Sequence, residues 1–77
     1  MSIARKLRKL RTDKGLTQMQ IADVLHTTQQ QYSKYEHEIQ EIPVRHIVTL
    51  CRFYRVSADW LLGLSEQKAL SSATQSK

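Results

Sequence analysis

The sequence predicts an all-α fold with five helices. Apolar residues recur at intervals of three and four along most of the chain, which is the period of helices buried on one face. Thr17, Thr28 and Ser57 are residues of the type that caps helix N-termini, and each stands directly before such a segment. No segment alternates apolar and polar residues as a half-buried strand does, so we expect no sheet.

Length and composition favour one small domain. A chain of 77 residues has room for a single core, and we expect it to cover residues 3–63, followed by a polar, flexible tail at 64–77. One cysteine, Cys51, excludes an internal disulfide. Neither a signal peptide nor a run of roughly 20 apolar residues is visible. These observations predict a cytoplasmic protein without a membrane partner.

Basic residues are concentrated near the N-terminus. The formal net charge is +5, and six of the twelve Lys and Arg residues lie within the first fourteen positions. This distribution favours a polyanionic partner, either nucleic acid or a membrane surface, although a solvated helix face explains it equally well. A membrane surface is the weaker alternative, because the apolar stripe of the first helix is narrow and contains no Trp or Phe.

The first two helices are predicted from their spacing and their ends. The first should run from Ile3 to Lys14, with Leu7 and Leu10 on its apolar stripe and Gly15 as a left-handed terminator. The second should open at Thr17, where residues 17–20 have the capping-box pattern. Its buried face is expected at Ile21, Ala22 and Leu25, and the chain then turns at His26.

The third helix, from Thr28 to His37, has two different faces. Its first residues repeat the capping-box pattern, with Gln31 at the reciprocal position. The inner face comprises Tyr32, Tyr35 and Glu36, and the outer face comprises Gln29, Gln30, Ser33 and Lys34. Amide side chains on an outward face can pair with N6 and N7 of adenine. The two helices over 18–37 therefore indicate a helix-turn-helix that binds duplex DNA.

The remaining helices complete the predicted core. Residues 37–42 should form a loop, and Pro43 suits the first position of a helix that ends at Tyr54. Its inner stripe is expected at Ile47, Leu50, Cys51 and Tyr54. Ser57 should cap a last short helix that stops at Gly63. The apolar residues around this helix are more than the last two helices need for their own packing. In so short a chain most of them could simply be core, and a possible dimer face comprises Phe53, Val56, Trp60 and Leu61.

Two segments in this order resemble one known family. LTQMQIADVLHTTQQQYSKYE and IPVRHIVTLCRFYRVSADWLLG are similar to the helix-turn-helix and to the helix 4–helix 5 region of the phage Cro and cI repressors and of the xenobiotic-response-element regulators. The resemblance covers residues 3–63. It implies a compact, five-helix, lambda-repressor-like DNA-binding domain. It also implies a transcriptional regulator, most often a repressor, that reads a palindromic operator as a homodimer.

The resemblance also implies roles for individual residues. The residues expected to contact base edges are Gln29, Gln30, Ser33 and Lys34. The residues expected to contact phosphates are Gln18, Thr28 and Arg11. Arg11 and Glu36 match a pair that ties the first helix to the third. Two positions depart from the family pattern. His26 stands where a glycine is usual, and the acidic residues Glu38 and Glu41 lie where phosphate-binding basic residues are common.

The sequence leaves one alternative function open and argues against others. The chain could be the antitoxin half of a toxin–antitoxin pair, which is a protein-interaction module that can also bind DNA. The three histidines and Cys51 have no metal-ligand spacing, so we expect neither a metal nor another cofactor. We expect no enzyme activity, since no phosphate loop and no nucleophile–base pair is visible.

Overall fold

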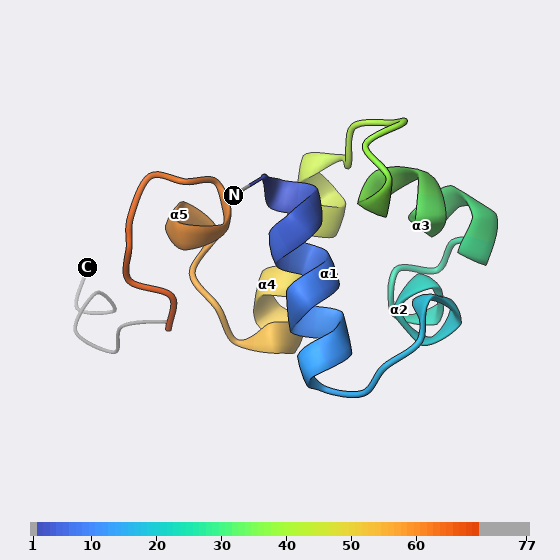
Figure 1. Cartoon of the computed structure of the whole chain (residues 1–77), viewed down its shortest axis with the longest axis horizontal. Coiled ribbons are helices and arrows are strands. Elements are labelled where there is room, and N and C mark those ends of the chain that lie inside the picture. Colours follow the sequence, from blue (N-terminus) through green and yellow to red (C-terminus); the bar gives the residue numbers. More distant parts are fainter. Residues whose placement is uncertain (1, 70–77) are drawn as a thin grey trace.

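The computed structural model describes residues 2–69 and has five helices in this range, without a strand (Figure 1). These helices confirm the predicted all-α class. They are α1 (Ile3–Asp13), α2 (Gln18–Val24), α3 (Gln29–Glu36), α4 (Val44–Tyr54) and α5 (Ala58–Leu61). The longest has 11 residues. Among the described residues, no helix is long and apolar enough to cross a bilayer.

Hydroxyl side chains set the starts of four helices. Ser2, Thr17, Thr28 and Ser57 each accept a hydrogen bond from the backbone N–H three residues further along, which satisfies one of the free donors at a helix N-terminus. Pro43 is different. Its ψ of 152° is extended, so α4 begins one residue later than predicted, with Pro43 in the capping position.

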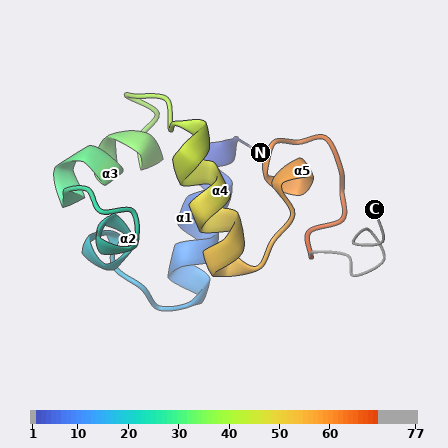
Figure 2. The ribbon, with the colours of Figure 1, turned by 180° about the vertical axis from the view of Figure 1, so that it is seen from behind.

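The core gathers around α1 and α4, which occupy the centre in two opposite views (Figures 1 and 2). The α2–α3 pair lies on one side of this centre and α5 lies on the other. Each helix contributes buried apolar side chains, and the largest of those that are fully buried are Leu7, Ile21, Tyr32, Leu50 and Leu61. The predicted inner stripe of α4 is buried throughout. The core therefore holds the helix-turn-helix against one side of a rigid centre.

The predicted dimer face is only partly at the surface. Val56 and Leu61 are 4% and 1% exposed and belong to the core of this chain, so they cannot form such a face. Val56 lies beyond the left-handed Arg55, which ends α4 at φ 60° and turns the chain inward. Phe53 remains 42% exposed, and Trp60 is half-buried. The dimer face stays a prediction for Phe53 and Trp60 alone.

Residues 64–69 return to the body of the protein, which differs from the flexible tail predicted from residue 64 onward. The backbone N–H of Ser57 donates to the carbonyl of Lys68 at 2.8 Å, and Val56 pairs with Ala69 in an isolated antiparallel bridge. The ammonium groups of Lys68 and Lys6 lie 5.3 and 4.8 Å from the ring centre of Trp60. The rest of the predicted tail, 70–77, lies outside the described residues.

The hydroxyl of Tyr54 gives a direct test of the core. The side chain is buried, and its hydroxyl has no hydrogen-bond partner within residues 2–69. Burial also raises the pKa of this phenol. Tyr54→Phe removes the unpaired oxygen and keeps the ring, so we expect the free energy of unfolding in urea to stay unchanged or to rise by up to about 1 kcal/mol. A loss of more than about 1 kcal/mol would show that the hydroxyl is bonded.

Candidate nucleic-acid interface

The turn between α2 and α3 has the tight geometry expected of a helix-turn-helix. His26 adopts the left-handed conformation, with φ 58°. This places the Thr27 N–H on the carbonyl of Ala22 at 2.9 Å, which closes the end of α2. The chain is then extended at Thr28, where α3 begins. Histidine therefore fills the position where the family uses glycine, at the modest cost of a left-handed non-glycine residue.

The inner face of α3 is anchored by aromatic side chains. Tyr32 is fully buried and Tyr35 is 6% exposed. Their rings meet edge-on, with centroids 6.3 Å apart, and the ring of His46 on α4 lies 5.9 Å from that of Tyr35. On the facing helix, Ala22 is 1% exposed, and its small side chain allows α2 and α3 to approach closely. The inner side of α3 is thus packed against α2 and α4.

The outer face of α3 carries the predicted base-reading side chains. Gln29, Gln30 and Lys34 are exposed, and Ser33 is half-buried. Together with Met19 on α2 they line one open hollow of about 640 Å³. The structure therefore brings all four predicted residues together. Met19 was missed by the sequence reasoning, although helical periodicity places it opposite the buried Ile21 and would have identified it.

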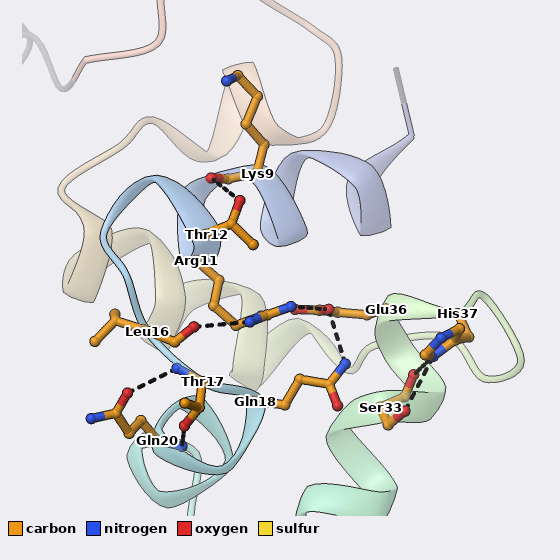
Figure 3. A network of polar contacts seen from close by, with 10 residues as sticks. All are labelled: Lys9, Arg11, Thr12, Leu16, Thr17, Gln18, Gln20, Ser33, Glu36 and His37. Atoms are coloured by element: carbon orange, nitrogen blue, oxygen red, sulfur yellow. Dashed lines mark hydrogen bonds and ion pairs between the residues drawn. The ribbon is translucent and has the colours of Figure 1, made fainter.

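Two polar contacts fix the ends of this outer face. The Ser33 hydroxyl lies 3.1 Å from Nδ1 of His37, which is also 2.8 Å from the Ser33 carbonyl (Figure 3). At the other end, the Thr28 hydroxyl accepts from the Gln31 N–H at 3.1 Å. The predicted reciprocal bond, from the Thr28 N–H to the Gln31 side-chain oxygen, is wrong, because the structure of residues 2–69 does not contain it. The Gln31 Nε2 instead donates to the side-chain oxygen of Gln40 at 2.8 Å. Gln31 therefore ties α3 to the loop that follows it.

A buried ion pair joins α1 to α3 (Figure 3). The Arg11 guanidinium donates from Nε to Oε2 of Glu36 at 2.7 Å and from Nη2 to Oε1 at 3.1 Å. A third donor, Nη1, reaches the carbonyl of Leu16 at 2.8 Å. The two side chains are 13% and 2% exposed. The pair predicted from the family resemblance is thus present as a two-pronged contact, and it also holds the segment that leads into α2.

Gln18, the first residue of α2, belongs to the same network. Its Nε2 donates to Oε1 of Glu36 at 3.1 Å (Figure 3). Burial alone would raise the pKa of Glu36, but the hydrogen bonds from Arg11 and Gln18 outweigh this effect and hold the pKa below its ordinary value. The carboxylate stays ionised and fixes the side chain of Gln18. One hydrogen on Nε2 remains for a group outside the protein.

The structure shows Arg11 in a structural role. Its side chain is largely buried and uses three of its five N–H groups, one each on Nε, Nη1 and Nη2, within the protein. The phosphate contact of Arg11 stays a prediction.

One carboxylate of the acidic loop after α3 is hydrogen-bonded within the fold. Glu38 adopts the left-handed conformation at φ 61°, and its carboxylate accepts from the Ser2 hydroxyl at 2.8 Å. This carboxylate therefore lies beside the N-terminus of α1, where the helix dipole favours negative charge.

Metal ligands do not cluster in the described part of the chain. Within residues 2–69, no three His, Cys, Asp or Glu side chains gather as metal ligands would.

Comparison with known proteins agrees with this geometry. The family model described as "Helix-turn-helix" matches residues 7–61. The chain belongs to the Cro/cI-type helix-turn-helix family. This is a family of DNA-binding proteins and not of enzymes.

Three relatives from Bacillus subtilis (strain 168) show the same likeness. The chain is 38% identical over 61 residues to the HTH-type transcriptional regulator YobD, covering 79% of this chain and 54% of YobD. It is 40% identical over 57 residues to the SPbeta prophage-derived regulator YonR, covering 74% and 53%. With the HTH-type transcriptional regulator ImmR it shares 32% identity over 66 residues, covering 86% and 52%. The chain thus spans about half the length of these relatives.

A solved structure shares the fold. The crystal structure of a transcriptional regulator from Listeria innocua superimposes with a TM-score of 0.78, covering 97% of this chain and 69% of that one. The two sequences are 21% identical, so this likeness concerns the fold alone.

The ion pair predicts a pH-dependent stability. Because the pKa of Glu36 is lower in the folded protein than in the unfolded one, the ionised pair stabilises the fold above the unfolded value of about 4.3. This contribution is lost as the pH falls through the folded-state pKa. We expect Glu36→Gln to lower the free energy of unfolding by about 3 kcal/mol at neutral pH, and the difference from wild type should shrink below about pH 4.

Urea denaturation followed by circular dichroism at several pH values measures this difference. Glu66→Gln, at an exposed position, is the matched control and should change stability little at any pH. A difference between wild type and Glu36→Gln that stays constant from neutral to acidic pH would contradict the ionised pair.

Proposed function

We propose that this chain is the DNA-binding module of a transcriptional regulator and recognises a specific sequence in duplex DNA. The observation that carries the proposal is the outer face of α3. There, amide, hydroxyl and ammonium groups surround one open hollow, while the inner face is fixed by buried tyrosines. Such a helix can lie in the major groove, as the second helix of a helix-turn-helix does. The family membership and the relatives described as transcriptional regulators support the same function.

Each residue of the face has a proposed role. Gln29 and Gln30 pair with adenine through N6 and N7, and Lys34 donates to O6 and N7 of guanine or to a phosphate. Ser33 supplies a hydroxyl one turn further along the helix. These four side chains would select the sequence, since the major groove presents a different pattern for each base pair.

Two residues at helix N-termini are proposed to hold the phosphate backbone. Gln18 has its orientation fixed by Glu36 and keeps a free amide hydrogen. Thr28 is an exposed residue that caps α3, and its hydroxyl accepts from the Gln31 N–H and would donate its own hydrogen to a phosphate. Helix N-termini favour phosphate because their N–H groups and dipoles point toward it. The net charge of +5 would strengthen such contacts with any DNA sequence.

We further propose that the protein acts in the cytoplasm as a homodimer that represses transcription from a palindromic operator. The exposed Phe53 and the half-buried Trp60 offer the aromatic surface for a second copy. A two-fold dimer would read two half-sites about one helical turn apart. Repression follows where the operator overlaps a promoter.

The roles of the two glutamines can be tested by binding measurements. The selected duplex is one that wild type enriches from a pool of random duplexes. We expect Gln29→Ala and Gln30→Ala each to weaken binding to this duplex by about 1–3 kcal/mol, with little effect on a random duplex, because each variant loses a base contact. Gln67→Ala, at an exposed position on the segment that follows α5, is the matched control and should bind like wild type. Fluorescence anisotropy at fixed salt measures all three. Equal losses on the selected and random duplexes would remove the base-reading role.

A further inference from the structure

Met19 is an apolar side chain on an otherwise polar face. It is the second residue of α2 and is 57% exposed. The other residues that line its hollow are Gln29, Gln30, Ser33 and Lys34. Each of these offers hydrogen-bonding groups, whereas Met19 offers a thioether and a methyl group. Met19 therefore supplies a kind of contact that its four neighbours do not.

Packing within the chain does not account for Met19. The buried face of α2 consists of Ile21 and Ala22, with Leu25 following at its end. The helical period turns Met19 away from Ile21, which follows it by two residues. The preceding residue, Gln18, is held by its bond to Glu36, and this fixes the first turn of α2. The backbone of Met19 is thus held in place while its side chain faces outward.

The hollow suggests what such a side chain could contact. If α3 lies in the major groove, the groups that face this hollow are the edges of base pairs. All of these edges present hydrogen-bond donors or acceptors, and only thymine adds an apolar group, its C5-methyl. Methionine is unbranched and flexible, so it can adapt to a methyl group whose position depends on the groove.

We propose that Met19 contacts the C5-methyl group of a thymine in each half-site and makes this chain select thymine at that position. The proposal rests on the proposed DNA-binding function. The side-chain amides of the glutamines would recognise adenine by hydrogen bonds, and Met19 would recognise a neighbouring thymine by apolar contact with its methyl group. The specificity of the chain is then set by α2 as well as by α3.

Replacement of single thymines by deoxyuridine tests the contact directly. Deoxyuridine keeps the base pair and its hydrogen-bonding groups and removes only the methyl group. In the selected duplex, we expect one thymine per half-site at which this replacement weakens wild-type binding about fourfold, the effect of losing one buried methyl group. At the same position, Met19→Ala should bind the thymine and deoxyuridine duplexes with equal affinity.

Two further variants provide the controls. Met19→Leu keeps an apolar side chain and should retain most of the preference for thymine over deoxyuridine. Val48→Ala removes apolar surface from α4, outside the hollow, where Val48 is 42% exposed. It should show the same preference as wild type. Thermal denaturation of all variants shows whether they are folded, and the exposure of Met19 predicts small changes.

The outcomes separate this inference from the proposed function. Suppose that wild type binds its selected duplex specifically, and that each deoxyuridine replacement weakens binding of Met19→Ala as much as binding of wild type. Met19 then does not read a methyl group, and the DNA-binding function stands. If wild type binds selected and random duplexes equally, the proposed function fails, and the role of Met19 fails with it.

Discussion

The buried contact between Arg11 and Glu36 is the interaction on which the arrangement of this protein depends. It links α1 to α3, and through Leu16 and Gln18 it also holds the segment that enters α2. Removing two charges from water is costly, and a buried pair is therefore a poor source of net stability. Breaking either partner would nevertheless be destabilising, because it would leave an uncompensated charge in the core. The pair also fixes where α1 and α3 lie relative to each other. The two helices of the helix-turn-helix are consequently fixed to the same carboxylate.

A short helix needs such support. α3 has only eight residues, and an isolated helix of that length is unstable in water. Its helical state therefore comes from the buried tyrosines, the Thr28 cap and the ion pair rather than from its own sequence. Most of the outer face is therefore free of packing within the chain, since Gln29, Gln30 and Lys34 are exposed. A row of polar residues can then be placed there and changed without loss of the fold.

Much of this organisation could be predicted from the sequence, because it depends on local rules. Helix periodicity and capping residues gave the five helices and the two faces of α3 to within a residue or two. Contacts between segments that are distant in the sequence are harder to predict. The bond from Gln31 to Gln40 competes with a local cap, and only the folded chain shows which partner is closer. Val56 is buried because the chain turns at the left-handed Arg55. The sequence does not predict this turn, since left-handed residues are usually glycine and residue 55 is not. The return of residues 64–69 depends on main-chain contacts with Ser57, which composition does not reveal.

We propose that this arrangement serves to read a sequence in duplex DNA. The most direct measurement is selection of bound molecules from a pool of random duplexes by the purified full chain, followed by sequencing. We expect enrichment of a palindrome with two related half-sites, whose centres lie about one helical turn apart. Sequence-specific binding would be contradicted if the recovered duplexes shared no sequence, or if the recovered pool contained no more binding molecules than the starting pool.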